Sequence, residues 1–257
     1  MGRGKRQISS SGVYHIVNKG VGNQMIFEDD SDKEVFMSML ESHKKEQDIK
    51  IFAFCLMENH FHLLILDKEN HLSKFMQNLC SEYAIYFNRK YLRCGHLFND
   101  RFKSEAIEDD SYLLTAFRYI ILNPEKAKVC NHQTYRWSSF REYYSNGNNA
   151  KISDCEYVEG LFSNKKEFLV YLSDSQNDDD KKCLEIKEHS FFGIFDEVAK
   201  KVIREKINIS SCTQIRSFEK TKRNKILSSL RKEGFSIRLL ERLTGVSRGI
   251  IQKIEAA

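Results

Sequence analysis

The sequence predicts an α+β fold in which helices cover an antiparallel sheet close to the ferredoxin-like type, followed by a small all-α domain. Two observations support this prediction. Short β-rich segments and helical segments alternate over the first half of the chain, in the order β-α-β-β-α-β-α. Two polar stretches then interrupt the chain, and a basic segment with helical signals follows. The chain has 257 residues, enough to bury a core without cross-links.

The first elements are a strand and a helix. Order is expected to begin near Val13 with a short β-rich segment at 13–18. A helix at 33–46 follows, because its apolar residues recur at helical spacing. Asp30 and Ser31 are the candidates for its N-cap, since both side chains can accept a hydrogen bond from the first turn.

The remaining elements of this half follow the same alternation. They are strands at 50–56 and 61–66, a helix at 72–91, a strand at 101–107 and a helix at 111–122. The polar pair Glu58 and Asn59 separates the two apolar runs, as in a hairpin. Pro124 is the only proline, and it is expected to end the last helix because a residue before proline avoids the α region.

Composition divides the chain into four parts. We expect a basic flexible arm at 1–11, a catalytic-type domain at 12–145, a connector with an acidic linker at 146–188, and a helical domain at 189–257. No internal repeat of solenoid length is present.

The C-terminal segment is basic. From Arg216 to the end there are eleven basic and four acidic residues, whereas the net charge of the whole chain is +5. Helices are expected at 222–232, 237–243 and 248–254. Ser236 is the expected cap of the second, and a tight turn at 244–247 leads into the third. A helix-turn-helix is therefore predicted, and its alternative is a helical cap that contacts only protein.

Cysteine usage and hydropathy favour a reduced, cytoplasmic protein. The seven cysteines are scattered, with neither a C-x-x-C pair nor an even framework. No basic and apolar leader opens the chain, and no apolar run approaches the roughly 18 residues of a membrane span. We therefore expect no membrane partner.

The most informative short motif is His60-Phe61-His62. Residues i and i+2 of a strand point to one face, so the two imidazoles would project together while Phe61 enters the opposite layer. Such a pair is half of a site for a divalent metal. The alternative is a pair of histidines with satisfied hydrogen bonds, and a zinc hydrolase would need a third histidine and a carboxylate where four aliphatic residues follow.

A second candidate site lies at Tyr119 and Asn123. Residues four apart on a helix share a face, so a hydroxyl and an amide would stand one turn apart, just before Pro124. A tyrosine can attack a phosphodiester, and an amide oxygen can complete a metal site. Since the chain has eleven tyrosines, a purely structural role is the alternative for Tyr119.

Four ordered motifs resemble those of the REP-associated tyrosine transposases, a branch of the single-tyrosine HUH transposases. They are Val13-Tyr14-His15-Ile16-Val17-Asn18-Lys19-Gly20, Met57-Glu58-Asn59-His60-Phe61-His62, Gly95-His96-Leu97-Phe98-Asn99-Asp100-Arg101-Phe102-Lys103 and Arg118-Tyr119-Ile120-Ile121-Leu122-Asn123-Pro124. The resemblance covers roughly residues 11–144, including Trp137-Ser138-Ser139. Lys19 stands where many relatives carry arginine, which keeps the charge.

The resemblance implies an HUH nuclease fold and a specific chemistry. His60, His62 and Asn123 would be ligands of a divalent metal, Mg²⁺ or Mn²⁺, and Tyr119 would be the nucleophile. The enzyme would be a DNA transposase that nicks and joins single-stranded DNA, with hairpins as its targets, through a 5′-phosphotyrosine link. Because the link retains the energy of the bond, a 3′-hydroxyl can reverse the step without ATP. The resemblance leaves open whether the chain works as a homodimer or alone.

Basic and aromatic residues are the candidates for DNA binding. Cations can pair with phosphates while neighbouring rings stack on bases, although a solvated basic face is the alternative. The candidate DNA-binding residues are Arg89, Lys90, Arg93, Arg101 and Lys103 in the first domain and Arg238, Arg242, Arg248 and Lys253 in the second, which would bind duplex DNA.

Two other functions are compatible with parts of this pattern. One is a catalytically silent, sequence-specific DNA-binding regulator derived from a transposase. Against it, the residues of the expected site are all present. The other is a rolling-circle replication or plasmid-mobilisation nuclease, but those proteins order the tyrosine and histidines differently or carry a helicase domain.

Overall fold

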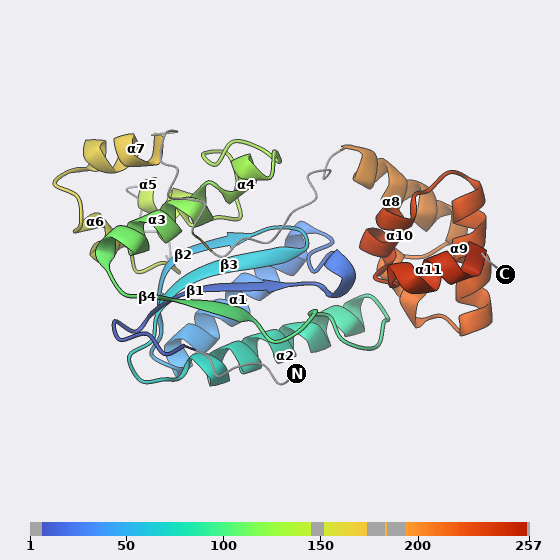
Figure 1. Ribbon diagram of the computed structural model, residues 1–257, viewed down its shortest axis with the longest axis horizontal. Helices are drawn as coiled ribbons and strands as arrows, with labels where there is room; N and C mark the ends of the chain where they lie inside the picture. The colour runs from blue at the N-terminus through green and yellow to red at the C-terminus, as the bar shows by residue number, and fades with distance from the viewer. Residues whose placement is uncertain (1–6, 145–151, 174–182, 184–193, 256–257) are drawn as a thin grey trace.

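A four-stranded sheet forms the centre of the first part of the molecule, and a group of helices lies at one end of it (Figure 1). The computed structural model describes residues 7–144, 152–173, 183 and 194–255. Residues 1–6 of the expected arm and the acidic stretch at 174–182 lie outside this part of the chain.

All neighbouring strands of the sheet are antiparallel. The strands are β1 (Val13–Lys19), β2 (Lys50–Leu56), β3 (His60–Leu66) and β4 (Lys103–Ile107), in the spatial order β2-β3-β1-β4. Their order along the chain, with helices between and after them, confirms the predicted α+β fold.

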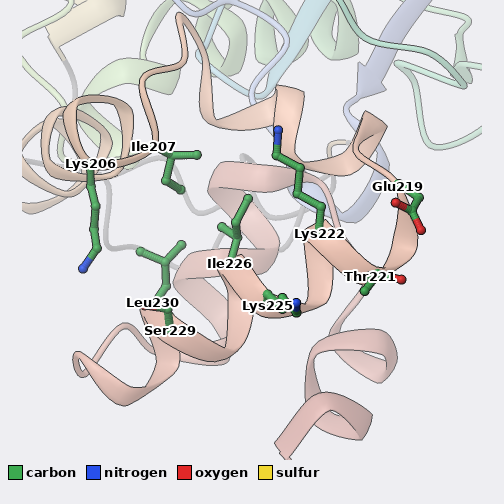
Figure 2. Close-up of a pocket in the computed structure, with 9 residues that line it drawn as sticks. All are labelled: Lys206, Ile207, Glu219, Thr221, Lys222, Lys225, Ile226, Ser229 and Leu230. Carbon is green, nitrogen blue, oxygen red and sulfur yellow. The ribbon is translucent and has the colours of Figure 1, made fainter.

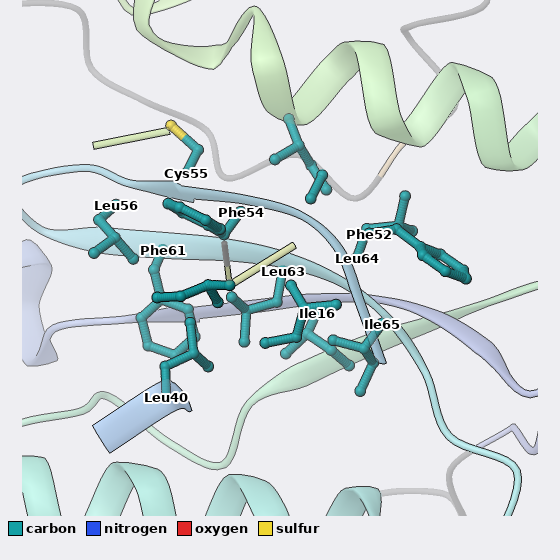
Figure 3. Packing of buried hydrophobic residues seen from close by; sticks show 14 of the residues in the cluster. Ile16, Leu40, Phe52, Phe54, Cys55, Leu56, Phe61, Leu63, Leu64 and Ile65 are labelled. Atoms are coloured by element: carbon teal, nitrogen blue, oxygen red, sulfur yellow. The ribbon is translucent and has the colours of Figure 1, made fainter. Parts of the chain in front are cut away.

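One face of the sheet is covered by two long helices, α1 (Asp30–Glu46) and α2 (Leu72–Lys90). Alternate residues of each strand enter this layer. On β3 they include Phe61, whose ring centroid lies 4.9 Å from that of Phe36 on α1. Figure 3 shows Phe61 near Leu40 of α1 below the sheet, while Cys55 projects from β2 on the other side.

The opposite face is covered by shorter helices. They are α3 (Asp110–Ile121), α4 (Asn123–Lys126), α5 (Phe140–Tyr144), α6 (Cys155–Glu159) and α7 (Lys165–Ser173). Phe168 of α7 contacts Phe117 of α3 and Tyr143 of α5 through its ring. The described part of the expected connector thus belongs to the hydrophobic core of the first domain.

The C-terminal helices form a second, smaller core. They are α8 (Ile194–Ile207), the 3-10 helix η3 (Cys212–Ser217), α9 (Lys220–Lys232), α10 (Ile237–Thr244) and α11 (Arg248–Glu255). The Ser236 side chain accepts a hydrogen bond from the Leu239 N–H and so caps α10, as predicted. Gly245 adopts a left-handed conformation with φ of 68° and starts the turn into α11.

The second core is docked onto the first domain at η1 (Val21–Asn23) and the residues that follow it. Met25 belongs to the C-terminal core, and Ser211 donates to Glu28 at 2.8 Å. Gly245 meets Gln24 so closely that a Cβ at this position would lie 2.0 Å from the Gln24 Oε1. The glycine is therefore needed for both the turn and the contact.

Two details of the predicted helices are wrong. The N-cap of α1 is Asp29 instead of Asp30 or Ser31, because its carboxylate accepts from the Asp32 N–H while the Asp32 side chain bonds back. Pro124 does not end the helix that carries Tyr119. That helix ends at Ile121, and proline occupies the first turn of α4, where its missing N–H costs nothing.

The seven cysteines are free thiols. Among the described residues, no helix is both long and apolar enough to cross a membrane.

Candidate nucleophile and metal site

His60 and His62 lie on the sheet face that α3 covers. Both side chains are buried, and their ring centroids are 5.1 Å apart at nearly right angles. The strand register places Cys55 and Val17 beside His62 and Lys19 beside His60. The period of two that sends Phe61 into the opposite layer therefore brings the two imidazoles together.

Tyr119 reaches the histidines from α3. Its ring centroid lies 5.6 Å from that of His62, and only 5% of the residue is exposed. The Asp109 side chain caps α3 by accepting from the Tyr112 N–H, which fixes where the helix begins. The structure thus brings together the expected nucleophile and the His62 imidazole.

Asn123 completes the group from the start of α4. Its Nδ2 lies 3.4 Å from the His62 Nε2, and its Oδ1 is buried without a hydrogen-bond partner. A buried, unsatisfied amide oxygen is costly unless a further group binds it. Because the two ends of an amide have nearly the same shape, a turn of the side chain would place Oδ1 where the His62 Nε2 points.

This donor set fits a divalent metal with open coordination positions. Two imidazoles and one amide oxygen leave room for water or a phosphate oxygen. A closed cluster of three or more His, Cys, Asp or Glu side chains does not occur among the described residues. The site is therefore of an open type that requires a neutral His62.

The electrostatics keep His62 neutral. Burial lowers the pKa of His62 well below its ordinary value, and the charges of His60, His15 and Lys126 lower it further. Burial also lowers the pKa of His15, although the hydrogen bond and the charge of Glu105 act in the opposite direction.

His15 is a residue of the site that had no role in the sequence analysis. It is fully buried on β1, and its Nε2 lies 3.0 Å from the His62 Nδ1. On its other side, Nδ1 lies 3.6 Å from a carboxylate oxygen of Glu105. A hydrogen bond to one ring nitrogen fixes which nitrogen is available to a metal. The sequence did contain one signal for this role. His15 and Val17 are two residues apart on one strand and therefore share a face, and Val17 lies opposite His62.

Lys126 is a second residue that the sequence did not indicate. Its Nζ lies 4.2 Å from the centroid of the Tyr119 ring. The break between α3 and α4 makes this contact hard to predict, because a spacing of seven residues has no fixed meaning across two helices. The ammonium group places a positive charge beside the candidate nucleophile.

The basic residues expected to bind DNA in the first domain have different surroundings. Arg89, Arg101 and Lys103 are exposed. Lys90 is held by Asp29 and Asp32, at 2.9 and 2.7 Å. These two contacts leave the Lys90 ammonium less available to DNA.

Arg93 is buried in the first domain. Its guanidinium donates to the Gln24 Oε1 and the His96 carbonyl, both at 3.3 Å, and burial lowers its pKa to about 10. It therefore supports the contact with the C-terminal helices.

A groove of about 1350 Å³ runs between α2 and the segment before β4. Phe98, Phe102, Arg101 and Lys103 line it together with Asn18. Aromatic and basic residues in one groove are suited to single-stranded nucleic acid, as the sequence suggested.

In the C-terminal domain, Arg238, Arg248 and Lys253 are exposed. Arg242 pairs instead with Asp196 through two hydrogen bonds, of 2.8 and 2.5 Å, and so joins α10 to α8. Three of the four expected DNA-binding residues are thus exposed, although Arg248 also pairs with Glu241 at 3.3 Å.

A second groove, of about 610 Å³, lies between the end of α8 and α9 (Figure 2). Ile207, Ile226 and Leu230 contribute apolar side chains to it, and Lys222 and Lys225 contribute basic ones.

Part of the chain is similar to known proteins. Residues 9–123 match the family described as "Transposase IS200 like". Among solved structures, one of a REP-associated tyrosine transposase bound to a REP hairpin is similar, with 14% identity, coverage of 57% of this chain and 87% of that chain, and a TM-score of 0.49. A candidate transposase from Deinococcus radiodurans R1 is also similar, with 16% identity, coverage of 44% and 91%, and a TM-score of 0.34. No curated protein matches the chain.

Proposed function

We propose that this chain, in which residues 9–123 match the family described as "Transposase IS200 like", is a transposase that nicks and rejoins single-stranded DNA through a 5′-phosphotyrosine at Tyr119. The observation that carries this proposal is the meeting of Tyr119, His62 and Asn123, which come from three separate elements. A tyrosine that only filled the core would not need two buried histidines and an unsatisfied amide beside it.

The proposed chemistry requires a divalent cation, Mg²⁺ or Mn²⁺. His60, His62 and the Asn123 Oδ1 would hold it, and when bound it would polarise the scissile phosphate. His15 keeps the His62 ring oriented through the hydrogen bond to Nδ1. The depressed pKa of His62 keeps its imidazole neutral near pH 7, and a neutral imidazole has one unprotonated nitrogen that can bind a metal.

Tyr119 performs the bond exchange in this proposal. Its oxygen forms a bond to phosphorus and loses its proton to solvent, while the bond from phosphorus to the 3′-oxygen breaks. The leaving oxygen keeps the electron pair and takes up a proton, which gives a free 3′-hydroxyl. The reverse reaction with another 3′-hydroxyl joins two strands. The Lys126 ammonium, beside the Tyr119 ring, stabilises the negative charge that gathers at the phosphate.

We place the substrate in the hairpin class that the REP-associated branch implies, on the strength of the four ordered sequence motifs. The exposed groove lined by Phe98, Phe102 and Arg101 supports binding of an unpaired strand. In the C-terminal domain, Arg238, Arg248 and Lys253 are accessible for contacts with a duplex stem.

A trapping experiment tests the proposed function. Hairpin oligonucleotides from the DNA that flanks the gene are incubated with the protein and Mn²⁺ or Mg²⁺, and the covalent adduct is measured on a denaturing gel. We expect an adduct that EDTA prevents and that Tyr119→Phe abolishes. Tyr157→Phe is the matched control, because this tyrosine is exposed on α6, where its hydroxyl donates to Asp110.

The same experiment separates the rival function. A silent DNA-binding regulator would bind the hairpin with either metal and yet form no adduct. An adduct that persists in Tyr119→Phe would show that another residue is the nucleophile.

A further inference from the structure

Two lysines project from the sheet onto the same face as His60 and His62. Lys19 on β1 lies opposite His60 on β3. Lys103 on β4 lies opposite Val17, which in turn lies opposite His62. Directly opposed residues of antiparallel strands share a face, so the lysine pair, Lys19 and Lys103, continues the row that contains the metal ligands.

The lysine pair is a concentration of like charge. Lys103 lies opposite Val17, two residues from Lys19 along β1 and on the same face, so the two long side chains are diagonal neighbours within reach of each other. The Lys19 Nζ donates to the amide oxygen of Asn23 at 3.2 Å, which offers no negative charge. Two neighbouring cations without an anion cost free energy, so the arrangement suits an anionic ligand.

The acidic residue nearest along the same strand is directed elsewhere. Glu105 follows Lys103 on the same face of β4, but its carboxylate lies 3.6 Å from the His15 Nδ1 and also bonds to Tyr112. Within the described part of the chain, neither Lys19 nor Lys103 forms an ion pair. A phosphate could therefore bind there without displacing a carboxylate.

The backbone around Lys19 is held firmly. The Asn99 N–H donates to the Lys19 carbonyl at 2.9 Å, and the Gly20 N–H donates to the Asn59 carbonyl at 2.9 Å. The Asn59 Oδ1 accepts a hydrogen bond from the His60 Nδ1 at 2.7 Å. The lysine and the metal ligand are thus tied to the same residue, which fixes their separation.

We propose that Lys19 and Lys103 bind backbone phosphates of the single strand beside the scissile one and so guide the strand from the β4 edge to Tyr119. This inference rests on the proposed function. Two strand spacings separate Lys103 from His62, about 10 Å, so the phosphate that Lys103 meets is a neighbour of the one that is cut. α3 packs over β2 and β3, and Lys103 at the sheet edge is exposed.

The salt dependence of DNA binding tests the lysine pair. A hairpin with a single-stranded flank is titrated with Tyr119→Phe protein in Mg²⁺ over a range of salt concentrations, so that binding is measured without cleavage. Each phosphate contact with a single strand contributes about 0.7 to the slope of log Kd against log salt. Lys19→Gln and Lys103→Gln should each reduce the slope by about that amount, and the double variant by about twice as much.

Lys45→Gln is the matched control, since Lys45 is exposed on α1, where it pairs with Glu41, and does not line the groove. Its slope should equal that of the parent. Lys19→Arg and Lys103→Arg should keep the parent slope, and circular dichroism checks that every variant is folded.

Neutral phosphates locate the contact on the DNA. One phosphate at a time, near the scissile one, is replaced with a neutral methylphosphonate. At one or two positions this replacement should weaken binding by the parent protein. At the same positions it should not weaken binding by the double variant, which already lacks the two lysines. If the double variant keeps the slope of Lys45→Gln while the parent still binds, the lysine pair has no such role and the proposed function stands. If the parent protein binds no hairpin at all, both proposals fail.

Discussion

The two faces of the sheet are made by alternate residues of the same strands, yet at the start of β3 they have different chemistry. Toward α1 and α2, β3 presents Phe61, which packs in an apolar layer. Toward α3 and α4 it presents His60 and His62, which meet polar neighbours. The difference teaches that burial has two purposes here: on one face it stabilises the fold, and on the other it holds polar groups in the unprotonated, oriented state that a reaction needs.

The largest expected effect is a difference in the free energy of unfolding between variants of the two faces. Phe61→Ala should lower the free energy of unfolding by about 3–5 kcal/mol, because it leaves a cavity beside Phe36. His62→Gln should cost only about 1 kcal/mol, since glutamine can still bond to His15. Urea unfolding of the metal-free protein measures both. Equal losses in the two variants would contradict the comparison.

Metal affinity should show the reverse order. We expect His15→Ala to weaken Mn²⁺ binding by about 10–100-fold, the usual effect of removing a residue that orients a metal ligand. Isothermal titration with Mn²⁺ alone gives the affinity without any DNA. His43→Ala is the control, because this histidine bonds to Glu82 on the far side of the sheet. A His15→Ala affinity equal to that of the control would mean that His62 needs no orienting partner.

Lys126 extends the comparison from metal binding to the nucleophile. Lys126→Gln should slow adduct formation about tenfold, which corresponds to the loss of an ammonium contact with the Tyr119 ring worth about 1.4 kcal/mol. Single-turnover rates with saturating hairpin separate this effect from binding. Lys126→Arg should restore most of the rate. An unchanged rate in Lys126→Gln would mean that the contact between Lys126 and the Tyr119 ring does not contribute to adduct formation.

The smallest effect is a pH dependence that comes from the site face. The pKa of His62 is lower in the folded protein than in the unfolded chain, so the unfolded chain binds the proton first as pH falls. The metal-free protein should therefore lose stability progressively below about pH 6.5, the ordinary value for histidine. His62→Gln should reduce this loss, whereas His96→Gln, at an exposed position, serves as the control. A steeper loss in His62→Gln would reverse the sign and contradict the assignment.

Much of the fold could be predicted because its signals are local. The alternation of strand residues and the helical spacing gave the order of elements, and Ser236 and Gly245 gave the ends of α10. The break after Ile121 was not predicted, because proline is equally at home after one helix and in the first turn of the next. The N-cap of α1 was predicted too late in the sequence for a similar reason. Asp29, Asp30 and Ser31 follow one another, and each of these side chains can serve as a cap.

The candidate site was predictable only where the residues are close in sequence. His60 and His62 share a strand, and Tyr119 lies near Asn123, so spacing could indicate them. His15 and Lys126 act through contacts that depend on strand register and on the angle between two helices, which no short motif encodes. Lys90 and Arg242 show the opposite case, because a basic residue in a DNA-binding pattern can equally pair with a carboxylate of its own chain.

The close contact between Gln24 and Gly245 determines how the C-terminal helices are positioned on the first domain. If the C-terminal helices keep this position when DNA binds, the distance from Tyr119 to the exposed face of α11 stays constant. A DNA held at both places would have to offer its cutting position at a set number of nucleotides from its stem. Loop length in the nucleic acid, as well as its base sequence, would then determine which hairpins can be cut.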